Sequence, residues 1–296
     1  MRERLTITLK QDILDALDMQ IDGDRLRNRS HAIEFYLSKS LGQKALKVLI
    51  LAGGKPVNFG SSHGGVLPKA MVKIAGKPLL EQTLLKLKSA KFKDIIISLG
   101  EGGKIIKDYF KHGEALGLSI QYLEQDKSVT GPASALLQAK KWVEGSNFLL
   151  IYGDVLSDVD FIDLVQFHSL NKSSVCTMTL TSTDTAGLWG LAKMQGSRVV
   201  EFEEKPQNPK TFSRLINAGI YLMEPGIFKY ISPPPNLPPQ GGGIRTGGSK
   251  LESGILPRLA EEGKLYGYVY EGLWLDISNS AVYKQAVREL NKNDQN

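Results

Sequence analysis

The hydrophobic positions of the first 44 residues change their period once. At the start of the chain Leu5, Ile7 and Leu9 alternate with polar residues, which predicts a half-buried strand. Apolar residues then recur at helical spacing as far as a stop at Gly23, and Ser30 is the expected N-cap of a second helix. The two helical stripes are Ile13, Leu14, Leu17 and Ile21, followed by Ile33, Leu37 and Leu41. One strand and two short helices bury too little for a core at this size, so we expect the unit to dimerise.

From Leu46 onward, apolar runs alternate with helical stripes. This alternation predicts an α/β fold with a doubly wound, mostly parallel sheet, in which ligands bind at the carboxyl ends of the strands. The expected strands are 48–51, 95–99, 120–123 and 148–152, and the expected helices include 79–87 and 135–143. Strand-like runs then follow one another at 175–180, 188–194, 198–202 and 216–223. We expect these to form an antiparallel extension that carries the second half of a site.

The pattern predicts two domains and one insertion. Residues 1–44 form the first domain and residues 45–296 the second. Residues 232–249, SPPPNLPPQGGGIRTGGS, are dominated by proline and glycine, which predicts a flexible surface insertion. The insertion is either a tolerated loop or a polyproline segment that binds a partner.

Composition and charge narrow the class of protein only slightly. The chain is 42% hydrophobic and 23% charged, as is usual for globular proteins, and its net charge of +6 permits an anionic partner without requiring one. The single cysteine, Cys176, excludes an internal disulfide and offers no metal-ligand spacing. The first residues carry charges where a signal peptide needs an apolar core, and no stretch approaches membrane-spanning length. We therefore expect a cytoplasmic protein with no membrane partner.

Five short stretches of the second domain lie where ligand-binding loops are expected. They are LAGG…LPKAMVKIAGKP (51–78), EQDKSVTGPASAL (124–136), IYGDVLSD (151–158), EFEEKP…NAGIY (201–221) and GLWLDISN (272–279). Their order and spacing resemble those of the sugar-1-phosphate nucleotidylyltransferases, and the resemblance spans residues 46–292. It implies a Rossmann-like nucleotidyltransferase fold that binds a nucleoside triphosphate and a sugar 1-phosphate and uses Mg²⁺.

The resemblance assigns the nucleotide to the first two stretches. The glycine pair would let the backbone approach the nucleotide, because glycine has no Cβ, and Lys69 would act as a point charge on the phosphates. Gln125 would hydrogen-bond the base edge, although its spacing to Gly131 is one residue longer than is usual in the family. The nucleotide-binding residues implied are Leu51, Ala52, Gly53, Gly54, Lys69, Gln125 and Gly131.

The resemblance also implies a metal site and a sugar site. Asp154 and Asp276 would hold Mg²⁺, since two carboxylates with phosphate oxygens suit its octahedral coordination, and with Lys69 they are the catalytic residues implied. The alternatives are that Asp154 caps a turn and Asp276 a helix start. Glu204 would accept from sugar hydroxyls and Lys205 would pair with the sugar's phosphate, unless this segment is only a solvated strand edge. The sugar-phosphate residues implied are Gly153, Glu204, Lys205 and Asn217.

The glycine-rich loop departs from the pattern of the family. Members normally carry Gly-Thr-Arg or Gly-Ser-Arg shortly after the glycine pair, and this arginine binds the triphosphate. Residues 55–69, KPVNFGSSHGGVLPK, contain no arginine and are one residue longer. Lys55 or His63 would have to substitute, and neither is a planar bidentate donor. We therefore expect the loop to bind nucleotide while turnover is slow.

The first domain resembles a different family, the ribbon-helix-helix repressors, over residues 2–41. The resemblance rests on RLTITLKQDILDAL followed by NRSHAIEFYLSKSL. In that family the strands of two chains form a ribbon that enters the DNA major groove. The implied DNA-binding residues are Arg4, Thr6 and Thr8 on the bases, and the backbone around Arg29 and Ser30 on a phosphate. The alternative is a dimerisation arm that touches no DNA.

Three functions remain open from the sequence. The chain is an enzyme that transfers a nucleoside monophosphate to a sugar 1-phosphate, with a DNA-binding arm. Alternatively it is a transcriptional regulator whose degenerate nucleotidyltransferase domain senses a nucleotide or sugar phosphate. The third possibility is an ordinary enzyme with an oligomerisation arm. The missing arginine favours the regulator, whereas Lys69, Asp154 and Asp276 favour the enzyme.

Overall fold

The computed structural model describes residues 6–21, 26, 28–42, 46–58, 65–125, 131–183, 186–208, 213–231, 250–277 and 283. The chain divides into two compact units, Met1–Ala45 and Leu46–Asn296. Arg4, His63 and the insertion at 232–249 lie outside the described residues. None of the helices in the described ranges combines the length and the apolar character that crossing a bilayer requires.

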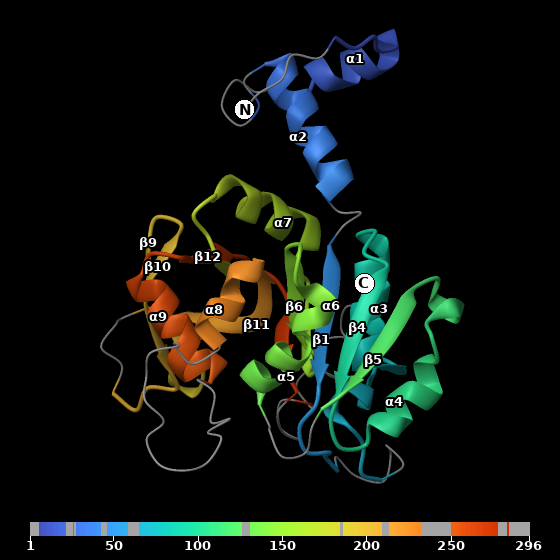
Figure 1. Ribbon diagram of the computed structural model, residues 1–296, viewed down its shortest axis with the longest axis vertical. Coiled ribbons are helices and arrows are strands. Elements are labelled where there is room, and N and C mark those ends of the chain that lie inside the picture. The colour runs from blue at the N-terminus through green and yellow to red at the C-terminus, as the bar shows by residue number, and fades with distance from the viewer. Residues whose placement is uncertain are drawn as a thin grey trace. The chain divides into compact units, whose positions relative to one another are not determined.

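The described part of the first unit contains two helices, α1 (Gln11–Asp18) and α2 (Arg29–Gly42) (Figure 1). Arg29 donates two hydrogen bonds to the carboxylate of Asp18, at 2.7 and 2.5 Å, and this pairing lowers the pKa of Asp18. The start of α2 is therefore tied to the end of α1.

The apolar core of this unit is small. Its buried residues are Leu17, Leu26 and Ala32. Ile13 and Leu37 lie on the two helices and expose 50% and 47% of their surface. These side chains leave apolar surface exposed in the single chain, and the expected dimerisation of the unit stays a prediction.

Two sequence expectations for this unit differ from the structure. The N-cap of α2 is Asn28 and not Ser30: Asn28 Oδ1 accepts from the backbone N–H of His31 at 2.9 Å, and its carbonyl oxygen accepts from the N–H of Ala32. Both residue types cap helices well, so the sequence alone could not choose between them. Of the strand expected near the start of the chain, residues 6–10 are described and are not a strand in the single chain.

Within the described residues, the second unit is built on a nine-stranded mixed sheet. Its order is β5-β4-β1-β6-β11-β8-β12-β10-β9, with parallel pairing from β5 to β6 and between β8 and β12, and antiparallel pairing at the other junctions. The strands are β1 (Lys47–Ala52), β4 (Asp94–Leu99), β5 (Ser119–Glu124), β6 (Phe148–Tyr152), β8 (Cys176–Ser182), β9 (Gly190–Gln195), β10 (Arg198–Glu204), β11 (Leu215–Met223) and β12 (Leu265–Val269). The sheet is therefore mixed and not mostly parallel, and the predicted antiparallel extension is continuous with the parallel part, because β11 pairs directly with β6.

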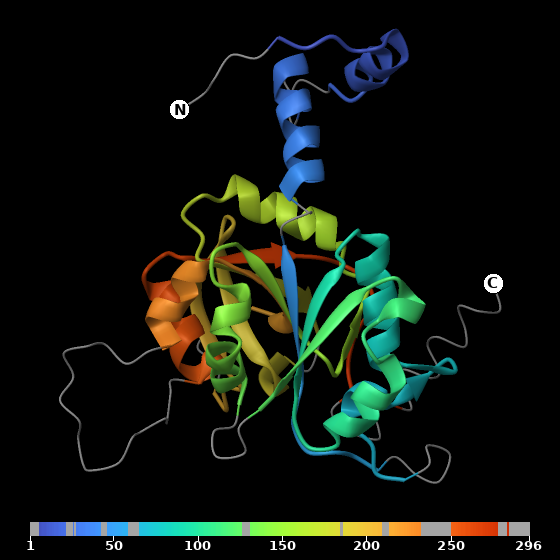
Figure 2. The ribbon, with the colours of Figure 1, turned by 45° about the vertical axis from the view of Figure 1, so that its right-hand side comes forward.

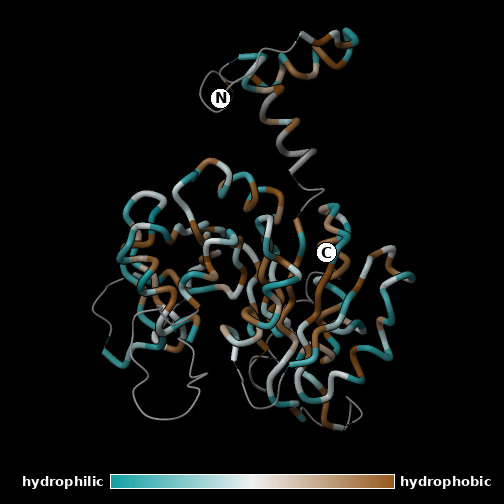
Figure 3. Tube along the Cα trace, in the orientation of Figure 1, coloured by the Kyte–Doolittle hydropathy of each residue, from teal (hydrophilic) through white to brown (hydrophobic). Residues whose placement is uncertain are grey.

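Helices cover both faces of this sheet, which confirms the doubly wound arrangement (Figures 1 and 2). The helices on one face are α3 (Leu79–Ser89), α4 (Gly103–Phe110) and α7 (Phe161–Leu170). Those on the other face are α5 (Pro132–Gln138), α6 (Lys140–Val143), α8 (Phe228–Ile231) and α9 (Leu256–Glu261). Along β1, Val48 and Ile50 belong to the first core and Leu49 to the second, as the period of a strand requires. Hydrophobic colour accordingly follows the central strands in Figure 3.

Two short pairs of strands complete the unit. The hairpin β2 (Lys73–Ile74) and β3 (Lys77–Pro78) follows the 3₁₀ turn η2 (Lys69–Met71). Strand β7 (Val155–Ser157) pairs antiparallel with β13 (Trp274–Asp276). A third apolar cluster joins these elements, with Ile74, Leu79, Leu156 and Leu275 among its buried members.

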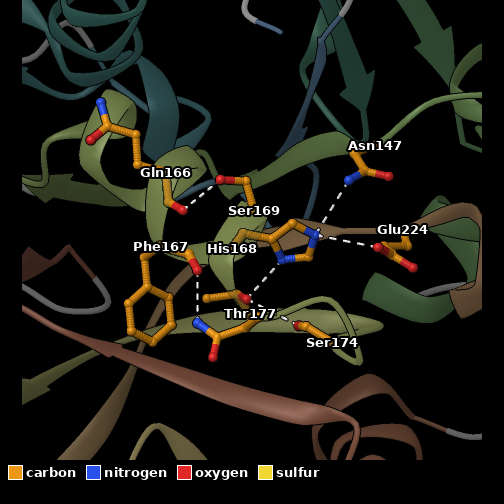
Figure 4. Close-up of polar contacts among 9 residues, drawn as sticks. Asn147, Gln166, Phe167, His168, Ser169, Ser174, Thr177 and Glu224 are labelled. Carbon is orange, nitrogen blue, oxygen red and sulfur yellow. Dashed lines mark hydrogen bonds and ion pairs between the residues drawn. The ribbon is translucent and has the colours of Figure 1, made fainter. Parts of the chain in front are cut away.

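A buried histidine ties α7 to the sheet (Figure 4). His168 is 4% exposed; its Nδ1 shares a hydrogen bond with Thr177 Oγ1 at 2.8 Å, and its Nε2 shares one with the Asn147 amide nitrogen at 3.3 Å. The carboxylate of Glu224 lies 3.7 Å from Nε2. Burial lowers the pKa of His168 to about 4 and raises that of Glu224. The ring is therefore neutral in the folded protein near pH 7.

This histidine should make the fold sensitive to mild acid. The unfolded chain protonates His168 near its ordinary pKa of 6.5, whereas the folded chain does so only near 4, so stability is lost as the pH falls through this window. Between pH 7 and pH 5 we expect His168→Gln to lose about 1–2 kcal/mol less unfolding free energy than the wild type. Urea titrations at both pH values measure this, with exposed His112→Gln as the control. Equal pH slopes for wild type and His168→Gln would contradict it. The facing Glu224 acts in the opposite direction and is unchanged in the comparison.

Candidate active site

A pocket of about 970 Å³ lies at the carboxyl ends of β1, β4, β5 and β6. Five segments line it, one from each of these strand ends and one from the start of α5. The lining residues are Leu51, Gly53, Gly54, Lys55, Leu99, Gly100, Glu101, Gly102, Gly103, Lys104, Glu124, Gln125, Gly131, Pro132, Tyr152 and Asp154. This is the edge at which the sequence predicted a ligand, and the volume suits a nucleotide-sized molecule.

Glycines, which have no side chain, let the loops of this pocket approach one another closely. A Cβ on Gly100 would lie 2.9 Å from the Cα of Gly53, so the loops after β1 and β4 touch backbone to backbone. A Cβ on Gly153 would lie 3.0 Å from the carbonyl oxygen of Leu51, which accepts the N–H of Gly153 at 2.9 Å. Larger residues at either glycine would push the loops apart.

Gln125 lies flat against the first glycine of the loop after β1. A Cβ on Gly53 would be 2.8 Å from Gln125 Nε2, so only glycine leaves room for this amide. The amide donates to the buried Ser98 Oγ at 3.0 Å, and the Gln125 backbone N–H donates to the Leu99 carbonyl at 2.9 Å. The amide is held at the pocket wall, where it can meet a base edge.

The remaining predicted nucleotide residues also lie at this edge. Gly131, with φ of +104°, is the N-cap of α5 and Pro132 occupies its first turn, as expected. Gly54, with φ of +96°, has no atom within 4 Å of the place of a Cβ and leaves its backbone open to the pocket. Leu51 lines the pocket and Ala52 is the buried last residue of β1.

The two predicted metal-binding aspartates are brought close by a strand pair. Asp154 follows β6, and the N–H of Ile277 donates to its carbonyl oxygen at 2.9 Å. In the β7–β13 pair Asp276 lies opposite Val155, the next residue after Asp154. Lys69 Nζ lies 3.0 Å from Asp154 Oδ2, and both side chains are about a quarter exposed.

These residues fit a divalent cation that also binds a ligand's phosphates. The ammonium of Lys69 already occupies a cation position on Asp154. Among the described residues no group of three or more His, Cys, Asp or Glu side chains could hold a metal by itself. A cation held by Asp154 and Asp276 would need its other ligands from phosphate oxygens and water.

Of the predicted sugar residues, Glu204 lies on β10, Lys205 directly follows it and Asn217 lies on β11. Glu204 ends β10, and Lys205 Nζ is 3.8 Å from its Oε1. Burial raises the pKa of Glu204, the negative charge of Glu252 raises it further, and Lys205 opposes the rise. Asn217 on β11 donates to the Tyr221 hydroxyl at 2.6 Å and accepts the N–H of Gly219. None of the predicted sugar residues, Gly153, Glu204, Lys205 and Asn217, is among those lining the large pocket.

Several pocket residues were missed by the sequence analysis. Lys104 and Glu101 come from LGEGGK after β4, a glycine-rich segment after an apolar strand that could have been found by the same reasoning as LAGG. Tyr152 and Ser98 are strand residues with no such signal. Of the two proposed substitutes for the missing arginine, Lys55 lines the pocket and His63 lies outside the described residues.

Comparison with known proteins gives the same class of fold. The family model described as "Nucleotidyl transferase" matches residues 47–293. The crystal structure of a "Putative Glucose-1-Phosphate Thymidylyltransferase" from Bacillus anthracis superposes with a TM-score of 0.69 at 27% identity, over 83% of this chain and 95% of that one. The first 46 residues lie outside the family match.

Curated relatives are similar over most of the chain. A rice protein named "Probable mannose-1-phosphate guanylyltransferase 3" is 28% identical over 253 residues, and the mannose-1-phosphate guanylyltransferase of Mycobacterium tuberculosis is 29% identical over 245. Each alignment covers 82% of this chain and 64% of the relative. The chain thus spans less than two thirds of the length of these relatives.

The Lys69–Asp154 ion pair predicts that Lys69 and a divalent cation compete for the same carboxylate, and this can be tested. Lys69→Met should raise the affinity for Mn²⁺ alone by roughly three- to tenfold, because the ammonium no longer competes for the Asp154 carboxylate. The same change should weaken binding of a nucleoside triphosphate, because the Lys69 ammonium that would pair with its phosphates is removed. Titration calorimetry measures both, with the exposed Lys77→Met as the control. Unchanged Mn²⁺ affinity in Lys69→Met would contradict the shared cation position.

Proposed function

The chain belongs to the nucleotidyl transferase family, and on that premise we propose that it transfers a nucleoside monophosphate from a nucleoside triphosphate to a sugar 1-phosphate. The observation that carries the proposal is the glycine-lined pocket of about 970 Å³ with the Lys69–Asp154 pair at its edge. A phosphate oxygen of the sugar 1-phosphate attacks the α-phosphorus, the bond from that phosphorus to the bridging oxygen breaks, and pyrophosphate leaves with the electron pair. No protein nucleophile is required, since the substrate phosphate is one, so catalysis is positioning and charge neutralisation.

Different residues of the chain would bind the phosphates, the base and the metal. Backbone N–H groups of Gly53 and Gly54 approach the phosphates, and Lys69 turns from Asp154 to the triphosphate. Gln125, held by Ser98, hydrogen-bonds the base edge. Asp154 and Asp276 would hold Mg²⁺, which when bound would neutralise charge on phosphate oxygens.

The sugar 1-phosphate would be held on the other side of Asp154. Glu204 and Asn217 take the sugar hydroxyls, and Lys205 takes the phosphate. Gly153 brings the strand ends together and leaves room between the two substrates.

The missing loop arginine bears on rate more than on affinity. An arginine aimed at the leaving pyrophosphate would stabilise charge that develops only in the transition state, and the loss of one such donor costs about 2.7–4 kcal/mol. Lys55 and Lys104 line the pocket and supply positive charge, but as ammonium groups they lack the bidentate geometry of arginine. We therefore expect tight nucleotide binding with slow turnover.

A pyrophosphate-release assay across nucleoside triphosphates and sugar 1-phosphates tests the proposal. We expect Mg²⁺-dependent release for one pair, and Asp154→Asn should lower the rate by at least about 100-fold, because it removes a carboxylate from the cation site. The control is Asp94→Asn, exposed at the start of β4. If calorimetry detects no binding of any nucleoside triphosphate, the proposal is wrong.

For the first 44 residues we propose a dimeric arm that binds DNA, with Arg4, Thr6 and Thr8 on the bases and the backbone at Arg29 and Ser30 on a phosphate. Two observations support it. Ile7 in the predicted strand is 43% exposed, which suits an apolar strand face awaiting a partner. Arg29 and Ser30 are the first two residues of α2, where backbone N–H groups point toward an anion. The competing reading is an arm that only dimerises.

The full-length chain with Thr6→Ala and Thr8→Ala tests the arm. We expect the double variant to bind DNA from its own upstream region roughly tenfold more weakly, with little change on random DNA, since the base contacts carry the specificity. Fluorescence anisotropy at several salt concentrations measures both. Absence of salt-dependent binding by the wild-type dimer would leave the arm as a dimerisation device only.

A further inference from the structure

A carboxylate that the sequence analysis did not single out lies beside the predicted sugar side. Glu252 is the second residue of the π-helical turn η6 (Leu251–Ile255). In this turn the N–H of Ile255 donates to the carbonyl oxygen of Lys250, five residues earlier. Single π turns of this kind occur often at functional sites, because they re-aim a side chain without ending the helix.

Glu252 is oriented by a residue that lines the nucleotide pocket. The hydroxyl of Tyr152 donates to Glu252 Oε1. Burial raises the pKa of Tyr152 well above its ordinary value, and the negative charges of neighbouring groups, Glu252 among them, add to the rise. The tyrosine therefore stays a proton donor, and its hydrogen bond fixes the direction of the Glu252 carboxylate.

The tyrosine is itself held in place. Its ring centroid lies 5.8 Å from that of Tyr221, whose hydroxyl accepts from Asn217 at 2.6 Å. A Cβ on Gly219 would lie 3.3 Å from Tyr152 Cδ2, so the glycine lets the ring pack against β11. Asn217, Tyr221, Tyr152 and Glu252 thus form a connected row from the predicted sugar side to the wall of the nucleotide pocket.

Two carboxyl groups, those of Glu252 and Glu204, lie along this row. Glu252 lies near enough to Glu204 for its charge to raise the pKa of that carboxyl. Gly190 makes room for Glu204, since a Cβ there would lie 2.7 Å from Glu204 Oε2. Lys205, 3.8 Å from Glu204, is the lysine assigned to the sugar's phosphate. Two carboxylates are then left for the rest of the sugar.

We propose that Glu252 is a specificity-determining residue that accepts hydrogen bonds from the sugar's hydroxyls beside Glu204. An ionised carboxylate only accepts hydrogen bonds, so the pair favours an uncharged ring that carries several hydroxyl donors. A second anionic group on the ring, such as a carboxylate, would meet two like charges in a partly buried place. The protein therefore accepts neutral hexose 1-phosphates and rejects hexuronic acid 1-phosphates.

This inference rests on the proposed function, and its test uses the full-length enzyme in the pyrophosphate-release assay. The probes are α-glucose and α-mannose 1-phosphates against glucuronic and galacturonic acid 1-phosphates. Glu252→Gln should raise KM for the better hexose 1-phosphate roughly tenfold, because a hydrogen bond to a charged group is lost. KM for the nucleoside triphosphate should stay within about twofold, since Gly53, Gly54 and Lys69 are unchanged. The ratio of kcat/KM for uronic acid over hexose should rise about tenfold, because a like charge is removed.

Two further variants separate recognition from folding. Tyr152→Phe keeps the packed ring and removes the hydroxyl that orients Glu252, and should raise the KM for hexose 1-phosphate by roughly threefold. Glu261→Gln, exposed at the end of α9, is the matched control and should leave both KM values unchanged. A fall in melting temperature without a change in the uronic acid to hexose ratio would show that Glu252 is only structural.

The inference and the proposed function fail in different ways. If the wild type turns over but Glu252→Gln keeps its sugar preference, or if the wild type uses uronic acid 1-phosphates as well as hexose 1-phosphates, the role of Glu252 is wrong and the enzyme reading stands. If the wild type shows no turnover, calorimetric binding of the same sugar 1-phosphates decides. Weaker hexose binding by Glu252→Gln would then support the inference, and absence of binding or equal binding would overturn it.

Discussion

Backbone touches backbone at the carboxyl edge of the sheet, and the geometry of the pocket depends on that contact. Gly100 brings the loop after β4 onto Gly53, and the N–H of Gly153 donates to the carbonyl of Leu51, so that three strand ends converge. Gln125 can lie against Gly53 only because no Cβ intervenes. The glycines therefore create the space in which a nucleotide would lie and bring Asp154 to its rim.

Charge at that rim is arranged so that one cation can replace another. Lys69 pairs with Asp154, and the strand pair β7–β13 carries Asp276 to the same place from the end of the fold. In the proposed function a metal bound with a triphosphate would replace the lysine on Asp154, and Lys69 would pair with the phosphates, so that neither charge would be left unpaired. Such an exchange would keep two carboxylates and a lysine at one rim compatible before and after binding.

The sequence predicted the parts that depend on local pattern and missed those that depend on distant pairing. Strands β1, β4 and β6 are largely buried on both faces and appear as apolar runs, and Gly131-Pro132 marks a helix start. The three-residue strands β7 and β13 are too short for a periodic signal. Glu252 could not be predicted, because a π turn has no sequence pattern of its own. Its partner Tyr152 lies on strand β6, 100 residues earlier in the chain. Asn28 and Ser30 are equally good caps by type, so the residue pattern alone could not show that Asn28 caps α2.

A crystal structure with Mn²⁺ and a non-hydrolysable nucleoside triphosphate tests the central claim most directly. The account predicts an anomalous peak between the carboxylates of Asp154 and Asp276, triphosphate density over Gly53 and Gly54, and Lys69 Nζ on a phosphate oxygen instead of on Asp154. A triphosphate bound elsewhere, or a metal peak away from the two aspartates with Lys69 still paired to Asp154, would contradict it.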